Sequence, residues 1–354
     1  MRILTIIGAR PQFIKAAMVS KALSEAGLEE VIAHTGQHYD ADMSDIFFEE
    51  LRLAKPQFNL GIGGGSHGQN TGRMIEALES IILKQDPDWV LVYGDTDSTL
   101  AGTLAAVKLH VPIAHVESGL RSFNRKMPEE INRILTDHAA TLLFAPTEIA
   151  VRNLSKEGIE GGAVKCVGDV MHDAALFFAD LARDKSTLLD RLGIAPKSYV
   201  LATIHRAENT DDRARLDLIF RGFAAFNRPI LLPLHPRTKS RLNKFDIVIP
   251  ENVTVIDPIG YLDMAQLESN ACLIATDSGG VQKEAFFHKV PCLTLRDETE
   301  WIELIESGWN RLAPLENAND IADIMSQSVG TIGESIALYG NGDAGKLVAS
   351  ALTS

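Results

Sequence analysis

Short apolar runs alternate with longer segments of helical composition along most of the chain. These runs predict ten strands: Ile3–Gly8, Val31–Thr35, Trp89–Gly94, Ile113–Glu117, Leu142–Pro146, Tyr199–Ile204, Ile230–Leu234, Val253–Asp257, Cys272–Thr276 and Cys292–Leu295. Most residues within these runs are apolar, which is typical of strands buried on both faces. The repeated order of strand, helix and strand therefore predicts parallel sheets covered by helices on both faces.

Ten strands are too many for one typical sheet, so we expect an α/β protein of two Rossmann-like, doubly wound parallel-sheet domains. The joint should fall near Val167-Gly168-Asp169, which divides the chain into an N-terminal domain (1–168) and a C-terminal domain (169–338). Residues 339–354 read as a turn and a short helix, and we expect this helix to pack back on the N-terminal domain.

Polar and ionisable residues follow the predicted strands at the edge where parallel sheets bind ligands. Arg10 and Lys15 follow the first strand, Asp95 and Glu117 follow two later strands, and His205 follows the first strand of the second half. The sequence thus predicts a cleft between the two domains, with carboxylates on one side and basic groups and glycines on the other.

The segment Ala275–Glu284 joins an apolar strand to a helix through two adjacent glycines. Backbone N–H groups at a helix start lack intrahelical partners and attract anions. Gly279 and Gly280 have no Cβ, so a phosphate could approach the backbone. Glu284, about one turn further on, could accept hydrogen bonds from a ribose. The alternative is an ordinary turn in which Ser278 only caps the helix.

Each candidate also has a purely structural interpretation. Asp95 could cap a helix that starts near Ser98. Glu129 lies in a predicted first helical turn, where acidic residues favour the helix dipole alone. His205 is a single histidine at a strand end, which is commonly structural. Glu117 is harder to explain in this way, because a carboxylate that directly follows an apolar strand usually needs a partner.

Composition narrows the functional classes. The 354 residues are 45% hydrophobic and carry a formal net charge of −13, which argues against a nucleic acid or an anionic membrane as the main partner. No apolar run is long enough for a signal peptide or a membrane span, so we expect a soluble, cytoplasmic protein. The three cysteines, Cys166, Cys272 and Cys292, are expected to be buried core residues of a reducing compartment, and no histidine spacing indicates a metal site.

Five motifs in register resemble the non-hydrolysing UDP-N-acetylglucosamine 2-epimerase family. They are Gly8-Ala9-Arg10-Pro11, Gly94-Asp95-Thr96, His115–Arg121, Pro128–Arg133 and Asp277–Glu284. The similarity runs from residue 3 to the Gly342-Asp343 turn. It implies the glycosyltransferase-B arrangement of two Rossmann domains, an active site in the interdomain cleft, a homodimer, and no cofactor or metal. The lack of a Gly-x-Gly-x-x-Gly loop after the first strand fits a reaction without nicotinamide.

Within the family the chain is more similar to one branch, the enzymes that epimerise UDP-2,3-diacetamido-2,3-dideoxyglucuronate for surface polysaccharide. The residues that carry this resemblance are Pro11–Lys15, His38-Tyr39-Asp40, Ser122-Phe123-Asn124 and Arg296–Trp301. Trp301 stands where the UDP-N-acetylglucosamine enzymes carry a nucleotide-binding arginine. Asp40 stands where regulated members carry a glutamine that helps to hold an allosteric UDP-sugar.

The resemblance also implies the chemistry. UDP leaves C1 and a proton leaves C2, which gives a 2-acetamidoglycal, and re-addition places the proton on the opposite face of C2. By this resemblance, the residues that move protons are Asp95, Glu117 and Glu129, and His205 assists departure of the diphosphate. Arg10 and Lys15 bind phosphate or set the charge state of the carboxylates. The diphosphate is held by Ser278, Gly279 and Gly280, with Glu284 on the ribose and Tyr261 near the uracil. A uronate carboxylate would need a cation, for which Arg121, Arg125, Arg133 and Arg206 are candidates.

Three other functions remain open at this point. The substrate could be UDP-N-acetylglucosamine, converted to UDP-N-acetylmannosamine. A glycosyltransferase would share the fold and the phosphate-binding turn, although three carboxylates on the N-terminal side favour reversible proton transfer. A nucleotide-sugar sensor would bind without turnover, but such a protein has no need of Asp95, Glu117 and Glu129 together.

Overall fold

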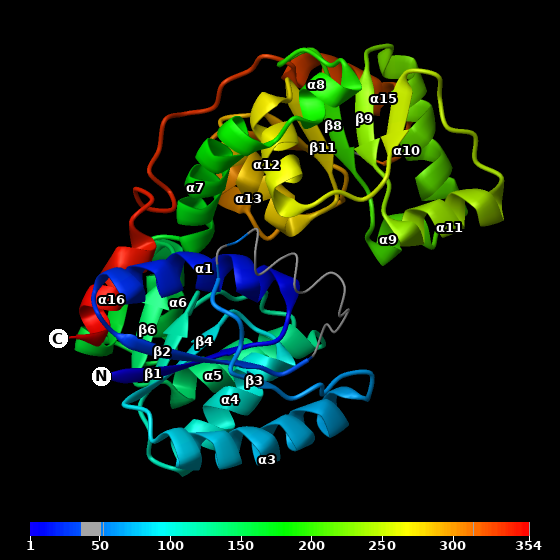
Figure 1. The fold of residues 1–354 in the computed structure, drawn as a ribbon. Helices are drawn as coiled ribbons and strands as arrows, with labels where there is room; N and C mark the ends of the chain where they lie inside the picture. The colour runs from blue at the N-terminus through cyan, green and yellow to red at the C-terminus, as the bar shows by residue number, and fades with distance from the viewer. Residues whose placement is uncertain (37–50, 52, 314, 354) are drawn as a thin grey trace. The chain divides into compact units, whose positions relative to one another are not determined.

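The computed structural model describes residues 1–36, 51, 53–313 and 315–353, so His38-Tyr39-Asp40 lies outside the described residues. The chain divides into two compact units (Figure 1). Unit 1 comprises Met1–Ala174 and Ala337–Ser354, and unit 2 comprises Ala175–Ile336. Each unit is built on one sheet, and each is described separately below.

Unit 1 contains a parallel sheet whose strands lie in the order β3-β2-β1-β4-β5-β6-β7. Their bounds are β1 (Arg2–Ile7), β2 (Glu29–His34), β3 (Phe58–Asn59), β4 (Trp89–Tyr93), β5 (Ile113–Val116), β6 (Leu142–Ala145) and β7 (Val164–Cys166). Alternate residues of β1 and β4, including Leu4, Ile6, Val90 and Val92, pack into one buried apolar cluster with residues of α3 and α4. Burial of these side chains is the main source of the stability of the unit.

Helices cover both faces of this sheet. Their bounds are α1 (Arg10–Glu25), α3 (His67–Gln85), α4 (Asp97–Lys108), α5 (Pro128–Ala139), α6 (Glu148–Lys156), the short helix Gly161–Ala163, the first residues of α7 (Val170–Lys185), and α16 (Ala344–Leu352). Figure 1 shows α1 on one face, and α3 and α4 on the other. The last helix, α16, packs against α1, and Asp173 accepts hydrogen bonds from the backbone N–H groups of Ala344 and Gly345 at its start.

Unit 2 contains a second parallel sheet, in the order β10-β9-β8-β11-β12-β13. Its strands are β8 (Val200–Thr203), β9 (Ile230–Pro233), β10 (Val253–Ile256), β11 (Leu273–Thr276), β12 (Cys292–Thr294) and β13 (Asn310–Leu312). Its helices are the rest of α7, α8 (Leu188–Leu192), α9 (Ala207–Thr210), α10 (Arg213–Phe226), α11 (Pro236–Phe245), α12 (Tyr261–Asn270), α13 (Gly279–Phe287), α14 (Ile302–Glu306) and α15 (Ala318–Ser328). Val200 and Leu201 enter different apolar clusters, which shows that both faces of the sheet are buried.

The strand order reverses once in each sheet, between β1 and β4 in unit 1 and between β8 and β11 in unit 2. In open α/β sheets, ligands bind beyond the carboxyl ends of the strands at such a reversal. The turns that follow β4 and β11 carry Asp95 and Asp277-Ser278, so the topology places the predicted site residues where this architecture binds ligands.

The predicted α/β fold with two parallel sheets is confirmed, and all ten predicted strands are present with ends shifted by a residue or two. The sequence missed β3, β7 and β13, because runs of two or three residues at or beside a sheet edge leave almost no periodic signal. One prediction was wrong. Cys166 is exposed rather than buried, because it lies on β7 at the edge of the sheet, while Cys272 is partly buried and Cys292 is buried.

Among the described residues, each helix is too short or too polar to span a bilayer.

Candidate active site

The first group of candidate residues lies at the carboxyl ends of β4 and β5 in unit 1. The register pairs Tyr93 of β4 with Val116 of β5, so the turns that carry Asp95 and Glu117 are neighbours. Lys15 of α1 reaches this edge, and its Nζ donates a hydrogen bond to Glu117 Oε2. Both side chains are largely buried, at 11% and 10% exposed. Lys15 is therefore the partner that the position of Glu117 requires.

Gly94 makes this pairing possible. A Cβ built on Gly94 would lie 3.2 Å from Glu117 Oε2 and 3.5 Å from Lys15 Nζ, and the residue has φ of +63°. Glu117 itself has φ of +72°, a left-handed conformation that is unfavourable for a residue with a long side chain. Strain of this kind persists only where the surroundings hold it, and it clusters at functional sites.

Asp95 is held by a different cation. Arg133 of α5 donates from Nη2 to Asp95 Oδ2 at 2.5 Å and from Nη1 to Glu130 Oε2 at 3.0 Å. Burial opposes the charge of Arg133, but Asp95 and Glu130 together raise the pKa of its guanidinium. The cap of α4 is Thr96, whose hydroxyl accepts from Thr99 N, so the interpretation of Asp95 as a helix cap is wrong.

Glu130 anchors the loop between Glu117 and α5. It accepts hydrogen bonds from the backbone N–H groups of Ser122 and Phe123 and from Arg133. Burial alone would raise the pKa of Glu130, but these donors hold it below its ordinary value. Glu130 is thus an ionised structural residue, whereas its neighbour Glu129 is half-buried, and the structure records no side-chain bond from Glu129 to any described residue.

Gln12 is a further residue that holds this edge together. Its Oε1 accepts from Gly8 N and Ala9 N at 2.8 and 3.0 Å, and its Nε2 donates to Tyr93 O at 2.8 Å. The side chain therefore fixes the turn after β1 to the end of β4. Arg10 begins α1 beside it, but the side chain of Arg10 lies outside the described part of the chain.

The second group of candidate residues lies in unit 2, where β8 and β11 end side by side, with Thr203 paired to Thr276. Asp277 follows β11 and is fully buried. Its carboxylate accepts from His205 N at 3.1 Å, Arg206 N at 3.0 Å and Asn209 Nδ2 at 3.1 Å, and it lies 3.6 Å from His205 Nδ1. Asp277 therefore fixes the turn that carries His205, whose ring is 41% exposed.

Replacing Asp277 with asparagine is expected to lower the free energy of unfolding by about 3 kcal/mol, because an amide cannot accept from every donor that now points at the carboxylate. Urea denaturation of the full chain measures this. Asp323→Asn, at an exposed position on α15, is the matched control and should stay within about 0.5 kcal/mol of the wild type. Equal stabilities of the two variants would contradict the structural role of Asp277.

The turn after Asp277 begins helix α13. Ser278 caps this helix by accepting from Val281 N at 3.4 Å. Gly280 is exposed, and a Cβ built there would meet no described atom closer than Ser278 Oγ at 3.8 Å. The N–H groups of Gly279 and Gly280 donate to no described residue. An anion could therefore reach the helix start over Gly280 without displacing protein atoms.

The space beside Gly279 is already occupied. A Cβ on Gly279 would lie 2.4 Å from Glu300 Oε1, so this glycine is needed to admit the carboxylate of Glu300. Arg296 Nη1 donates to Glu300 Oε2 at 2.7 Å, and Arg206 Nη2 lies 3.7 Å from Glu300 Oε1. Trp301 Nε1 donates to Gly279 O at 3.0 Å. The segment that follows β12 thus closes one side of the helix start.

Glu284 lies further along α13 and is nearly buried. Tyr261 donates to Glu284 Oε1 at 3.0 Å, and the Tyr261 ring packs edge-on against Phe178. Behind them, His288 Nε2 lies 3.6 Å from Glu268 Oε2. Burial raises the pKa of Glu268 to about 8. The pKa of Glu284 is also raised to about 8, mainly by burial and secondly by the charge of Glu268. Burial lowers the pKa of His288 to about 4.

These buried groups predict how stability depends on pH. An unfolded glutamate ionises near pH 4.5, so between pH 4.5 and about 8 the unfolded chain has released protons that the folded chain keeps. His288 acts in the opposite sense, but only below about pH 6.5. The free energy of unfolding is therefore expected to fall by at least about 1 kcal/mol per pH unit between pH 6.5 and 8.

Urea denaturation at a series of pH values tests this expectation. Glu268→Gln should make the decline shallower, whereas Glu251→Gln, at an exposed position of the same unit, should leave it unchanged. A decline that is as steep in Glu268→Gln as in the wild type would show that Glu268 is ionised in the folded protein at neutral pH.

Comparison with known proteins identifies the family. A family model described as UDP-N-acetylglucosamine 2-epimerase matches residues 21–353. A protein of Pseudomonas aeruginosa, UDP-2,3-diacetamido-2,3-dideoxy-D-glucuronate 2-epimerase, is 53% identical over 99% of both chains. The chain belongs to the UDP-N-acetylglucosamine 2-epimerase family.

Solved structures of family members share the fold. A crystal structure of the Methanocaldococcus jannaschii epimerase, in complex with UDP-GlcNAc and UDP, is 43% identical, with a TM-score of 0.88 over 100% of this chain and 99% of that one. The Neisseria meningitidis epimerase bound to UDP-GlcNAc is 30% identical, with a TM-score of 0.88 over 100% of both chains. The predicted membership, the glycosyltransferase-B fold class and the assignment as an epimerase are thereby confirmed.

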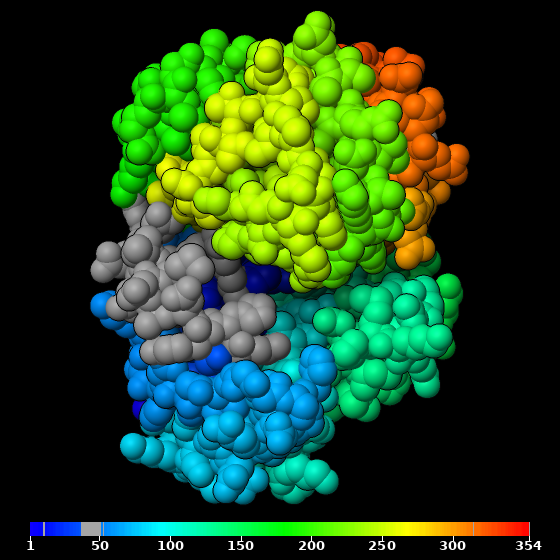
Figure 2. Space-filling model, turned by 90° about the vertical axis from the view of Figure 1, so that its right-hand side faces the viewer, coloured from blue at the N-terminus to red at the C-terminus, as the bar shows by residue number. Residues whose placement is uncertain are grey.

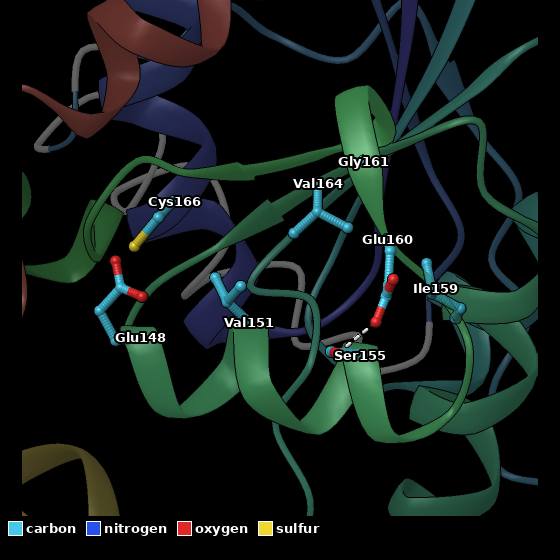
Figure 3. A pocket seen from close by; sticks show the side chains of 8 residues that line it. All are labelled: Glu148, Val151, Ser155, Ile159, Glu160, Gly161, Val164 and Cys166. Atoms are coloured by element: carbon cyan, nitrogen blue, oxygen red, sulfur yellow. Dashed lines mark hydrogen bonds between the residues drawn. The ribbon is translucent and has the colours of Figure 1, made fainter.

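One pocket in unit 1 of the epimerase is lined by none of the candidate residues. It has a volume of about 330 Å³ and is lined by residues of α6, β7 and the segment between them, among them Glu148 and Cys166 (Figure 3). Glu148 points toward the Cys166 thiol from the start of α6, and Ser155 donates to Glu160 Oε1 at 2.5 Å. Burial and the nearby Glu148 raise the pKa of the Cys166 thiol, so the cysteine is a poor nucleophile.

Sequence reasoning missed several residues that build the site of the epimerase. Asp277 directly follows an apolar strand, which is the signal that singled out Glu117, so it could have been found in the same way. Gln12 and Glu300 gave no such signal, because neither directly follows a predicted strand. Among the described residues, no group of three or more His, Cys, Asp or Glu side chains could hold a metal ion.

Proposed function

We propose that this epimerase inverts C2 of a UDP-2-acetamido sugar by eliminating UDP and adding it back through a 2-acetamidoglycal. Its proposed substrate is UDP-2,3-diacetamido-2,3-dideoxyglucuronate, after the Pseudomonas aeruginosa relative that is 53% identical. The observation that carries the mechanism is the arrangement at the ends of β4 and β5, where two carboxylates lie on neighbouring turns and each is held by its own cation.

The chemistry explains why two such carboxylates are useful. The C2 hydrogen of the sugar is not acidic, because no carbonyl is attached to C2, so a base must remove it while the bond from C1 to the diphosphate breaks. A second group must return a proton to the opposite face of C2. Glu117 beside Lys15 and Asp95 beside Arg133 supply two carboxylates in different surroundings. Glu129, at the first turn of α5, is the third proposed proton carrier.

Unit 2 is proposed to bind the UDP part. The open backbone over Gly280, with Ser278 and Gly279 beside it, supports a diphosphate at the start of α13. Glu284, held by Tyr261, is proposed to bind the ribose, with the uracil near Tyr261. Positive charge from Arg10 is proposed to help bind phosphate. In this proposal both units act on one UDP-sugar, which makes residues 1–168 the catalytic domain and residues 169–338 the UDP-binding domain.

His205 is proposed to assist departure of the diphosphate. Its ring is partly exposed, and Asp277 holds the backbone on which it sits. Oriented, preorganised donors of this kind stabilise charge that develops on a leaving group.

The contacts of the candidate arginines bear on the choice of substrate. Arg121 is buried and bound to Asp137 and Glu157, and Arg133 is bound to Asp95 and Glu130. Arg206 is one-third exposed and only loosely paired with Glu300, at 3.7 Å. Arg206 and the exposed Arg125 therefore remain as partners for a uronate carboxylate.

Parallel assays with two substrates test the proposal. UDP-2,3-diacetamido-2,3-dideoxyglucuronate and UDP-N-acetylglucosamine are offered separately in D₂O, and NMR follows the configuration and the deuterium content at C2. Inversion of the uronate with deuterium at C2 supports the proposal. Faster inversion of UDP-N-acetylglucosamine would favour the second candidate, the activity named for the Methanocaldococcus jannaschii structure. Binding without deuterium uptake would indicate a sensor, and sugar transfer to an added acceptor would indicate a transferase.

We also propose that the enzyme is a cytoplasmic homodimer, with no nucleic-acid or membrane partner. Met127, directly before α5, and Ile131 and Leu135 on α5 are spaced four residues apart and are 37%, 38% and 46% exposed. The surface of the segment around α5 is open to the viewer in Figure 2, in green-cyan. An apolar stripe on the solvent side of a helix is typical of an interaction surface. We propose that a second copy of this chain covers it.

Light scattering after size exclusion tests the dimer. The wild type is expected at twice the chain mass of 38.6 kDa. The double variant Ile131→Asp with Leu135→Asp is expected at about the mass of a single chain. Leu83→Asp, at a position of α3 that is 65% exposed, is the control and should leave the mass unchanged. A monomeric wild type would overturn this part of the proposal.

A further inference from the structure

His115 lies behind the catalytic edge of unit 1 and is fully buried. It sits on β5, two residues before Glu117, and both of its ring nitrogens have partners. Nδ1 lies 2.7 Å from Asp137 Oδ1, and Nε2 lies 2.8 Å from Gly94 O. A buried, doubly bonded histidine at this place has no role in the elimination itself.

Both partners of the ring can only accept a proton. A carbonyl oxygen has no hydrogen to donate, and a neutral imidazole carries only one N–H. Burial alone would raise the pKa of Asp137, but its bonds to His115 and Arg121 hold it below the ordinary value, so Asp137 is an ionised acceptor. The ring of His115 therefore spans two fixed acceptors, the carbonyl just beyond β4 and a carboxylate of α5.

The His115–Asp137 pair joins the three elements that carry the proposed proton carriers. His115 fixes Gly94, which precedes Asp95. Asp137 belongs to α5, the helix that carries Glu129 and Arg133, and its Oδ2 accepts from Gly119 N at 3.0 Å and from Arg121 Nη1 at 2.7 Å. Gly119 lies two residues beyond Glu117, so its bond to Asp137 fixes the turn in which Glu117 has a positive φ.

We propose that His115 is a positioning residue of the epimerase, whose ring ties the turn of Asp95 to α5 and, through Asp137, to the turn of Glu117. This inference rests on the proposed function, since it concerns the same reaction.

Other charged groups lie on the surrounding elements. They are Lys15 on α1, Arg133 and Glu130 on α5, Arg121 in the loop after β5, and Glu157 at the end of α6. Of these groups, Lys15 is bonded to Glu117, whereas His115 bonds the carbonyl of Gly94, immediately before Asp95.

Two variants test the alignment. His115→Gln removes the ring that spans the two acceptors but leaves a side chain that can donate to Gly94 O. The double variant His115→Gln with Asp137→Asn also removes the facing carboxylate, so that two neutral amides can bond each other and restore alignment. Circular dichroism and calorimetric UDP binding establish that each variant is folded.

The values of kcat and KM, followed by deuterium uptake at C2, give the decisive reading. We expect kcat to fall by about 10- to 100-fold in His115→Gln while KM stays within about twofold of the wild type, because misaligned carboxylates slow proton transfer without removing the residues proposed to bind UDP. In the double variant kcat should recover in part.

Other outcomes would overturn the inference. A kcat at the wild-type level in a folded His115→Gln would show that the ring does not align the two turns. A rise in KM and in the UDP dissociation constant that matches the fall in kcat would mean that the residue has only a structural role. A wild type that takes up no deuterium from any UDP-sugar would instead refute the proposed function, which the variants alone cannot do.

Discussion

Replacing Glu117 with glutamine is expected to lower turnover by at least ~10²-fold, as for other general acid–base residues. The amide keeps the size of the side chain and can still contact Lys15, but it cannot accept a proton. UDP affinity should survive, because Glu117 is not among the residues proposed to bind UDP, most of which belong to unit 2. Steady-state kinetics with the UDP-sugar substrate and calorimetry with UDP measure the two quantities.

Asp95→Asn and Glu129→Gln should show losses of the same order, since each removes one proposed proton carrier. The control is Glu79→Gln at an exposed position on α3, which should turn over at the wild-type rate. Turnover close to wild type in all three site variants would mean that the protons at C2 move through other groups.

Replacing Ser278 with tryptophan is expected to abolish measurable UDP binding. The indole would fill the space over the start of α13, where the exposed N–H groups of Gly279 and Gly280 are proposed to meet the diphosphate. The loss should exceed 100-fold in the calorimetric dissociation constant, since the ligand would lose both the helix start and its neighbouring donors.

Gly280→Ala tests the same site with a smaller change. Because a Cβ there meets nothing closer than Ser278 Oγ at 3.8 Å, the fold should keep its stability while UDP affinity falls about tenfold. Gly279→Ala differs, because the added Cβ would collide with Glu300. This substitution is expected to lower the stability of the fold as well. Unchanged UDP affinity in both Ser278→Trp and Gly280→Ala would exclude the helix start as the diphosphate site.

Trp301 shows how a replacement in sequence can be understood from structure. The sequence resemblance predicts that Trp301 replaces an arginine of the UDP-N-acetylglucosamine enzymes, yet a positive charge lies near this side chain. Lys283 Nζ lies 4.4 Å from the centre of the Trp301 ring, and the indole N–H is bound to Gly279 O. A cation over an indole face is attracted by the ring. The tryptophan therefore holds Lys283 beside the helix start.

The sequence by itself determined the sheets and the edges at which the site residues lie. Apolar runs of strand length, separated by helical segments, admit only parallel sheets with covered faces, and in such sheets the residues after each strand gather at one edge. Asp95, Glu117, His205 and Ser278 were found in this way. The family motifs then supplied the chemistry that position alone does not contain.

Only the tertiary structure decided which side chain each candidate meets. The partners Lys15 and Glu117 are separated by 102 positions, Arg133 and Asp95 by 38, and no local pattern encodes such pairs. The space at Gly279 proved to hold Glu300, and His115 proved to lie between two acceptors, because strands and helices distant in sequence are brought together by burial of their apolar faces. Contacts of this kind depend on the whole packed unit, and a reading of neighbouring residues cannot supply them.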